Sequence, residues 1–247
     1  MPSRKIRLDL ILVKKGIVQS RDRAQAMIMS GKVTVNGRII DKPGIQVLPE
    51  DDIALKGDDH PYVSRGGLKL EGALRILDVD IAGLVCLDVG ASTGGFTDCL
   101  LQHGAGRVFA VDVGYGQLAW KLRQDSRVVV IERKNIRHLP FEALSQFVDL
   151  ITVDVSFISL KKVIPEILKF MQKDTRILAL IKPQFEVGKG KVGNKGVVRD
   201  PALHADVIKD LIDFFAKIRL IHEFVNPSSI LGSKGNREFF ISLKFES

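Results

Sequence analysis

The first fifty residues of the chain carry two short helical patterns. Apolar residues recur on one side of the segment 8–12, and Gly16 can end that helix in the left-handed conformation. Ser20 is a favourable N-cap for a second helix, whose apolar residues fall on one face until Gly31. We therefore expect two short amphipathic helices at the start of the chain.

A hairpin follows these helices. The segments 33–35 and 38–40 have strand character, and Asn36-Gly37 between them is a dipeptide favoured in a type I′ turn. Two further short strands are expected at 45–47 and 53–55. Two helices and short strands of this kind predict a compact α+β unit.

From residue 85 onward, apolar strand-like runs alternate with helical stretches. The runs are 85–89, 108–111, 128–131, 150–153, 177–181 and 239–243. This alternation predicts an α/β domain with a largely parallel, doubly wound, Rossmann-like sheet. The polar segment 57–61 reads as a linker, so we expect a small domain at residues 1–60 and a larger one at 61–247.

A glycine-rich loop, Asp88-Val-Gly-Ala-Ser-Thr-Gly-Gly-Phe96, follows the first of these runs and opens a helix. Glycines allow a ligand to approach the backbone closely at the carboxyl edge of such a sheet. The next strand ends at Asp112, where a carboxylate can accept both hydroxyls of an adenosine ribose. NAD enzymes normally carry G-x-G-x-x-G, whereas this loop reads G-x-x-x-G-G after an acidic residue. The loop therefore favours S-adenosylmethionine, whose charged amino acid end suits Asp88 and the loop backbone, over a dinucleotide.

Asn135, which follows the third strand, allows two interpretations: a contact to adenine or the N-cap of a helix. With Asn135 included, the predicted cofactor-binding residues are Asp88, Gly90, Ala91, Ser92, Thr93, Gly94, Gly95, Phe96, Asp112 and Asn135.

Four charged residues at separate elements are candidates for catalysis. Asp154 and Lys182 end strands at the edge that carries the glycine loop, so both are expected to face the crevice of the cofactor. Lys69 precedes the first strand of the large domain, and Glu238 precedes the last. Any one of the four alone would be typical of surface charge, but the two strand-end positions favour a shared site.

The charge of the chain is concentrated at its start. The formal net charge is +8, and residues 1–42 carry ten Lys and Arg against three acidic residues, a net of +7. A strongly basic segment indicates an anionic partner. Taken singly, each basic residue is equally typical of a solvated helix face.

The segments Arg7-Leu-Asp9, Ser20-Arg-Asp-Arg-Ala24 and Gly31-Lys-Val-Thr-Val-Asn-Gly37 resemble the S4 domain, an RNA-binding fold, over about fifty residues. The resemblance implies that the basic residues neutralise RNA phosphates, with binding that weakens as salt rises. The implied RNA-binding residues are Arg4, Lys5, Arg7, Lys14, Lys15, Arg21, Arg23, Lys32 and Arg38.

Further motifs run through nearly the whole chain. They are Ser64-Arg-Gly-Gly-Leu-Lys-Leu70, the stretch 87–97 with the glycine loop, Asp154-Val-Ser-Phe-Ile-Ser159, Ile181-Lys-Pro-Gln-Phe-Glu186 and Gly193-Asn-Lys-Gly-Val-Val-Arg-Asp200. They resemble the TlyA family of two-domain RNA 2′-O-methyltransferases, sometimes described as hemolysins, whose catalytic half is related to the FtsJ methyltransferases. The resemblance implies S-adenosylmethionine as cofactor and ribosomal RNA as partner, with cytidine 2′-hydroxyls of 16S and sometimes 23S RNA as targets. The Lys-Asp-Lys-Glu set of the FtsJ-like relatives falls on Lys69, Asp154, Lys182 and Glu238.

A ribose 2′-hydroxyl is a poor nucleophile at neutral pH, so methyl transfer requires removal of its proton. A neutral Lys182 could accept that proton. Alternatively, a charged Lys182 could stabilise the developing alkoxide while Asp154 and Glu238 hold the two lysines. The sequence leaves both routes open.

Other features carry weaker expectations. Cys86 and Cys99 are expected to be reduced core residues, Trp120 is expected in the core, and no metal site is expected. The basic stretch 188–196 is either a flexible connection or a clamp on RNA or cofactor.

No signal peptide or membrane-spanning run is evident, which favours a cytoplasmic location. The rival hypotheses are a noncatalytic RNA-binding assembly factor and a membrane-damaging protein.

Overall fold

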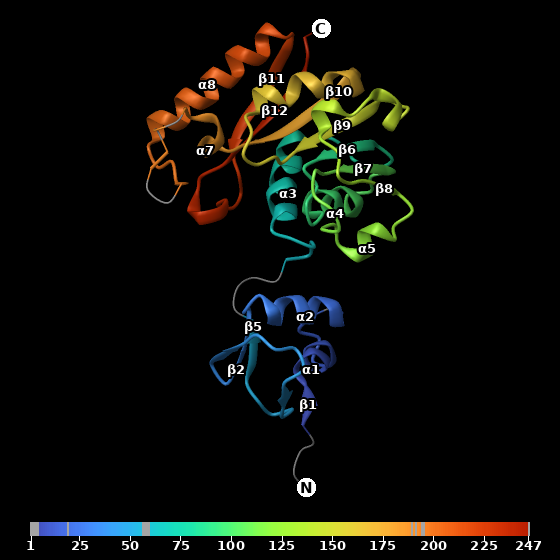
Figure 1. Cartoon of the computed structure of the whole chain (residues 1–247), viewed down its shortest axis with the longest axis vertical. Helices are drawn as coiled ribbons and strands as arrows, with labels where there is room; N and C mark the ends of the chain where they lie inside the picture. The colour runs from blue at the N-terminus through green and yellow to red at the C-terminus, as the bar shows by residue number, and fades with distance from the viewer. Residues whose placement is uncertain are drawn as a thin grey trace. The chain divides into compact units, whose positions relative to one another are not determined.

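The structure, a computed structural model, describes residues 5–18, 20–55, 60–188, 190, 192–193 and 196–246. The chain forms two compact units, Met1–Asp59 and His60–Ser247 (Figure 1). Each unit has hydrophobic core residues of its own. Residues 57–59 of the predicted linker lie outside the described residues.

The N-terminal unit combines two helices with short strands, as predicted. Its elements are β1 (Ile6–Arg7), α1 (Leu8–Lys14), α2 (Arg21–Met29), β2 (Val33–Val35), β3 (Arg38–Ile40), β4 (Gln46–Val47) and β5 (Ile53–Leu55). Strand β2 lies between β3 and β5, and β1 pairs with β4, all antiparallel. The sequence did not predict β1, because a two-residue strand leaves no periodic signal.

Local signals in this unit act as expected. The Ser20 side chain caps α2 by accepting a hydrogen bond from the Arg23 amide at 3.2 Å. Asn36 and Gly37 both have positive φ, 51° and 76°, as a type I′ turn requires. The helices bury Leu8, Leu12 and other apolar residues against the strands.

Asp9 is a charged residue inside this core, and its carboxylate is fully buried. It accepts hydrogen bonds from Arg7 at 2.9 and 3.0 Å, from Arg21 at 3.0 Å and from Gln25 at 2.9 Å. The Arg7 guanidinium, with help from Gln25 and Arg21, holds the pKa of Asp9 well below its usual range. Asp9 therefore orients two of the basic residues attributed above to RNA binding.

The C-terminal unit contains a seven-stranded sheet in the order β11-β12-β10-β9-β6-β7-β8. Its strands are β6 (Val85–Val89), β7 (Arg107–Val111), β8 (Val128–Ile131), β9 (Val148–Val153), β10 (Met171–Ile181), β11 (Leu220–Pro227) and β12 (Phe239–Phe245). Strands β6 to β10 pair in parallel, whereas β12 runs antiparallel to β10 and to β11. The predicted α/β class is confirmed. Strand β11 was not predicted because it is an edge strand, mostly exposed or half-buried, without a continuous apolar run.

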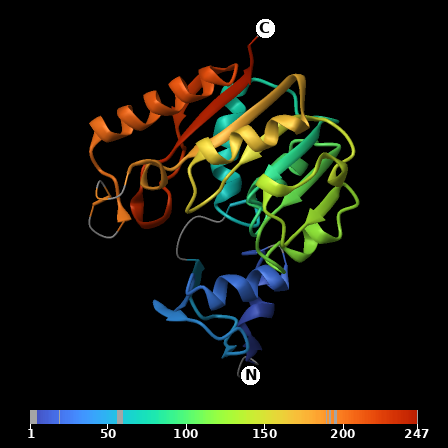
Figure 2. The ribbon, with the colours of Figure 1, turned by 45° about the horizontal axis from the view of Figure 1, so that its top comes forward.

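Helices cover both faces of this sheet (Figures 1 and 2). The α-helices are α3 (Gly66–Leu77), α4 (Gly95–Gln102), α5 (Trp120–Arg123), α6 (Ile164–Ile167), α7 (Pro183–Glu186) and α8 (Pro201–Lys217), and the short 3-10 turns include η1 (Ile136–His138) and η3 (Leu160–Lys162). Alternate residues of β6 enter different cores: Leu87 packs in the core of α6 and α8, and Cys86 in the core of α3 and α4. The sheet is therefore buried on both faces, as a parallel sheet requires.

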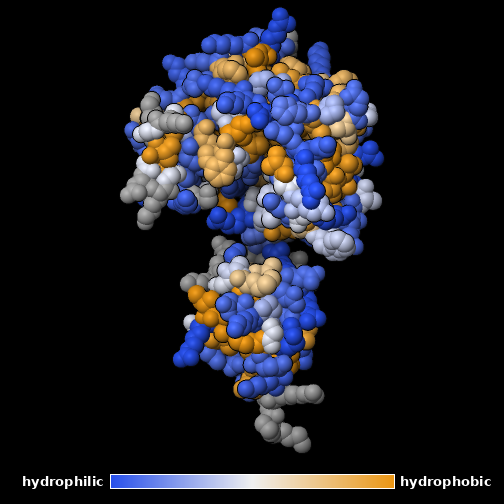
Figure 3. All heavy atoms as spheres, viewed as in Figure 1, coloured by the Kyte–Doolittle hydropathy of each residue, from blue (hydrophilic) through white to orange (hydrophobic). Residues whose placement is uncertain are grey.

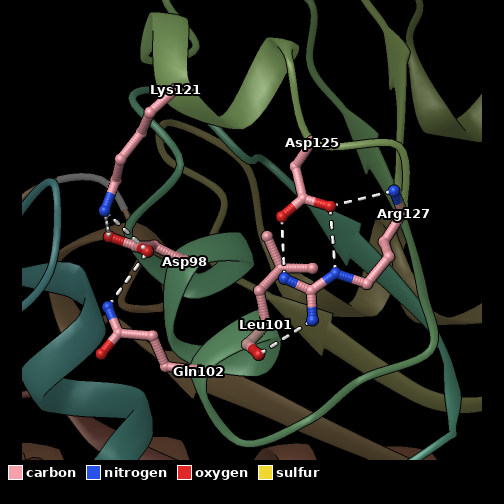
Figure 4. A network of polar contacts seen from close by, with 6 residues as sticks. All are labelled: Asp98, Leu101, Gln102, Lys121, Asp125 and Arg127. Carbon is pink, nitrogen blue, oxygen red and sulfur yellow. Dashed lines mark hydrogen bonds and ion pairs between the residues drawn. The ribbon is translucent and has the colours of Figure 1, made fainter.

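Polar contacts fix α4, the helix that follows the glycine loop (Figure 4). The Lys121 ammonium lies 2.9 Å from the Asp98 carboxylate of α4. Arg127 forms an ion pair with Asp125 at 2.7 Å and donates to the Leu101 carbonyl at 3.3 Å. These contacts tie the segment between β7 and β8 to α4.

Two expectations about single residues have different outcomes. Cys86 and Cys99 are buried and unpaired, as predicted. The prediction that Trp120 lies in the core is wrong, because its side chain is 68% exposed at the start of α5 while Leu122 of the same helix is buried. A helix of four residues can turn only one side inward.

The face of the molecule in Figure 3 is mostly hydrophilic, with separate patches of apolar residues on both units. Within the described part of the chain, we find no helix with the length and apolar character needed to cross a membrane.

Candidate active site

The carboxyl ends of the parallel strands bring the candidate residues to one edge of the sheet. Val89 of β6 pairs with Val111 of β7 and with Val153 of β9, so the chain leaves these strands side by side. The next residues along each chain are Gly90, Asp112 and Asp154.

Lys182 and Glu238 reach the same edge from the neighbouring strands. Ile181, the last residue of β10, pairs with Phe239, the first residue of β12. Because these strands are antiparallel, Lys182 after β10 and Glu238 before β12 lie at adjacent positions.

The glycine loop has a conformation that other residues adopt with difficulty. Gly90 and Gly94 have φ of 85° and 95°. A Cβ atom on Gly90 would lie only 2.5 Å from the Asp154 carbonyl oxygen. Gly90 therefore lets the loop after β6 pass directly against the end of β9.

A cavity of about 420 Å³ opens beside this loop. Its walls include four of the predicted cofactor-binding residues, Gly90, Ser92, Asp112 and Asn135, together with Asp154. Asp112 is held by two backbone amides: Ser92 donates to one carboxylate oxygen at 2.8 Å and Gly114 to the other at 2.6 Å. Both oxygens keep a further lone pair.

Asn135 caps a short helix and also lines the cavity. Its side-chain oxygen accepts from the Arg137 amide at 3.1 Å and caps η1, so the N-cap interpretation is confirmed. The same residue lines the cavity, as does Ile136.

Asp88 lies beneath the loop rather than in the cavity wall. Its buried carboxylate accepts hydrogen bonds from Thr97 at 2.6 Å and Thr152 at 3.0 Å. Burial raises the pKa of Asp88 to about 6, against the opposing effect of these two hydroxyls. Asp88 therefore joins the start of α4 to β9 and supports the loop from below.

The remaining loop residues predicted to bind the cofactor, Ala91, Thr93, Gly94, Gly95 and Phe96, are also outside the cavity wall. Phe96 is buried and stacks on Phe240, with 6.0 Å between ring centroids.

The four candidate catalytic residues form two ion pairs. Lys69 of α3 lies 2.6 Å from Glu238, and both side chains are nearly inaccessible to solvent. Lys182 lies 2.5 Å from Asp154, and its ammonium also donates to the Ser156 hydroxyl at 3.0 Å. Each lysine is therefore oriented by a carboxylate from a different part of the chain.

Glycine also shapes the surroundings of Glu238. A Cβ atom on Gly232 would meet a Glu238 carboxylate oxygen at 2.0 Å. A side chain at this position would therefore force the Glu238 carboxylate to shift from its position beside Lys69.

Sequence reasoning missed the role of Glu186. Its carboxylate accepts from the Ser159 hydroxyl at 2.6 Å and from the Leu160 amide at 2.8 Å, and burial raises its pKa. It thereby ties the segment after β10, which carries Lys182, to the segment after β9, which carries Asp154. Glu186 and Ser159 belong to two motifs quoted above, but only the fold brings these motifs together.

Phe157 is a second residue that the sequence analysis did not single out. It lines the cavity, is 90% exposed and packs on Phe185 with 4.9 Å between ring centroids. An aromatic side chain exposed to this extent marks the cavity rim as apolar.

The basic residues of the N-terminal unit are mostly at its surface. Lys5, Lys14, Lys15, Arg21 and Arg38 are exposed, and Arg7, Arg23 and Lys32 are half-buried. Arg4 lies outside the described residues, as do residues 189, 191, 194 and 195 of the basic stretch 188–196. Among the residues that the structure does describe, His, Cys, Asp and Glu form no cluster of three or more that could hold a metal ion.

Known proteins are similar to this chain along most of its length. The FtsJ-like methyltransferase family matches residues 62–245, and the S4 domain matches residues 6–53. The Bacillus subtilis protein YqxC is 47% identical over 98% of this chain and 87% of its own length. The 16S/23S rRNA (cytidine-2′-O)-methyltransferase TlyA of Mycobacterium tuberculosis is 44% identical over 99% of this chain and 92% of its own.

A solved structure is also similar. A Streptococcus thermophilus protein described as a candidate hemolysin is 39% identical, with a TM-score of 0.76 over 100% of this chain and 90% of its own.

The buried Asp88 carboxylate predicts a pH-dependent stability. Its raised pKa means that the folded state favours the protonated form, so its contribution to stability is present at about pH 4 and is lost as the pH rises through about 6. Asp88→Asn cannot ionise and should escape this loss. Chemical denaturation followed by circular dichroism should show the wild type losing up to about 3 kcal/mol relative to Asp88→Asn between pH 4 and 7. Parallel pH curves for the two proteins would contradict the assignment.

Proposed function

This chain belongs to the TlyA family of FtsJ-like methyltransferases with an N-terminal S4 domain, and we propose that it methylates ribose 2′-hydroxyls of ribosomal RNA with S-adenosylmethionine. The observation that carries the proposal is the pair of lysine–carboxylate contacts at the sheet edge, beside a cavity whose wall contains Asp112 and, from the glycine loop, Gly90 and Ser92.

The residues of the cavity fit S-adenosylmethionine, which supplies an electrophilic methyl group on its sulfonium. Asp112 has a free lone pair on each oxygen for the two ribose hydroxyls. The backbone amides of Gly90, Ala91 and Ser92 already donate to Val111 and Asp112, so this turn offers a close approach to the backbone rather than free donors. Asn135 with Ile136 offers a polar and an apolar contact for adenine. Asp88 serves this site indirectly, by holding the loop in place.

We assign Lys182 to act on the nucleophile, which is the ribose 2′-hydroxyl of the RNA. The 2′-oxygen forms a bond to the methyl carbon as the carbon–sulfur bond breaks, and the hydroxyl proton leaves. A neutral Lys182 accepts this proton; a charged Lys182 instead stabilises the developing alkoxide while water takes the proton. In both routes Asp154 and Ser156 fix the position of the lysine amine, and Lys69 with Glu238 forms the second half of the site.

The N-terminal unit supplies RNA affinity in this proposal. Its exposed lysines and arginines can neutralise phosphates with little sequence readout. The finer assignment, cytidine in 16S and 23S ribosomal RNA, rests on the name of the Mycobacterium tuberculosis relative.

The direct test supplies the protein with unmodified ribosomal subunits and methyl-labelled S-adenosylmethionine. After digestion of the RNA to nucleosides, we expect the label on the ribose of cytidine. Label on a base would overturn the proposed chemistry, and absence of label would favour a noncatalytic RNA-binding role. A liposome-leakage assay on the same preparation tests the membrane-damaging alternative.

Lys182→Ala should lower the rate of methyl transfer by at least about a hundredfold, because the nucleophile loses the group that acts on its proton or charge. Affinity for S-adenosylmethionine should stay within about twofold of the wild type, since Lys182 is not part of the cavity wall. The matched control is Lys173→Ala, which removes an exposed lysine from the other end of β10. Near-normal turnover of Lys182→Ala in single-turnover assays would refute its role.

Asp112→Asn should weaken S-adenosylmethionine binding by about ten- to a hundredfold. The ribose hydroxyls lose a charged acceptor, and an NH₂ group, which donates, replaces one of the two carboxylate oxygens. Isothermal titration calorimetry measures the change. Asp206→Asn, an exposed acidic residue of α8, controls for the lost charge. Equal affinities of the two variants would contradict the cavity assignment.

A further inference from the structure

A second cavity, of about 600 Å³, lies in the C-terminal unit beside the start of β12. We call it the α8 groove. It lies between the start of α8 with the residues before it and the turn that leads into β12. Its lining includes Arg199, Ile208, Leu231, Arg237 and Phe239.

Buried polar contacts brace the walls of the α8 groove. Asn236, which is 2% exposed, accepts from the Val198 amide at 3.1 Å and donates to the Gly196 carbonyl at 3.1 Å. His204 contacts the Val198 carbonyl at 2.9 Å and packs edge-on against Phe239. The turn and the start of α8 are therefore held together across the groove.

The groove lies at the same sheet edge as the candidate catalytic residues. Phe239 pairs with Ile181, so its strand begins one strand spacing, about 4.8 Å, from the end of β10 that carries Lys182. The cofactor cavity lies on the other side, at the ends of β6, β7 and β9. Lys182 and Asp154 are thus flanked by two cavities along one edge.

Two arginines of the groove make no polar side-chain contact within the described part of the chain. Arg199 and Arg237 are exposed, and neither forms an ion pair or hydrogen bond with any residue that the structure describes. By contrast, Arg127 and Arg176 of the same unit are paired with carboxylates. Unpaired guanidinium groups above an apolar floor match a ligand that is both anionic and aromatic.

We propose that the α8 groove binds a nucleotide of the RNA substrate next to the one that is methylated. Arg199 and Arg237 hold its phosphate, and Leu231 and Phe239 contact its base. The volume suits a ligand of nucleotide size, and single-stranded RNA is typically recognised through splayed bases and arginine contacts. The proposal rests on the proposed function and adds a substrate-positioning surface separate from the N-terminal unit.

The test compares Arg199→Ala and Arg237→Ala with Lys209→Ala, which removes an exposed lysine from the middle of α8. The groove variants should each raise the KM for ribosomal subunits by about tenfold and lower the slope of log KM against log salt by about one. The kcat at saturating RNA and the affinity for S-adenosylmethionine should stay within about twofold of the wild type. KM and salt slope equal to those of Lys209→Ala would overturn the proposal, as would a loss of kcat without a change in KM.

A second measurement does not depend on catalysis. Photo-cross-linking of the whole chain to thiouridine-substituted ribosomal RNA, followed by mass spectrometry, should place an adduct on the peptide 229–239. Adducts confined to the N-terminal unit would overturn the groove assignment. A wild type that is inactive but cross-linked at this peptide would refute the proposed reaction and leave the groove standing.

Discussion

The in-register parallel pairing of β6 with β7 and β9 is the constraint on which the catalytic unit depends. Val89, Val111 and Val153 lie side by side, so these three strands end at the same level of the sheet. A shift of one residue in any of these strands would turn its buried side chains to the opposite face. Backbone pairing inside the sheet therefore fixes the positions of polar groups at its edge.

The charges at this edge occur as pairs because single buried charges are costly. Glu238 is 2% exposed and is neutralised by Lys69, and Asp154 is matched by Lys182. Asp88, which has no cationic partner among its described contacts, relies on two threonine hydroxyls and has a raised pKa. Lysines fixed in this way need little reorganisation when charge develops on a substrate.

A buried charge is also paired in the N-terminal unit, where Arg7 and Arg21 neutralise the buried Asp9 carboxylate while both arginines remain accessible to solvent. Residues attributed to RNA binding thus also stabilise the domain. In the proposed enzyme, this unit provides affinity for RNA, the cofactor cavity holds the methyl donor, and the α8 groove binds the nucleotide next to the one that is methylated.

The sequence by itself determined the element types and the candidate residues, because these depend on short-range signals. Periodicity located β6 to β10 and β12, and Ser20 and Asn36-Gly37 marked a cap and a turn. The same signals failed for β1, β11 and Trp120, whose environments are set by neighbours distant in the chain. Only the tertiary structure showed that Lys69 pairs with Glu238, that Asp88 supports the loop from below and that Glu186 joins two motifs. Such contacts join residues up to 169 positions apart, and no local pattern specifies which partners the sheet brings together.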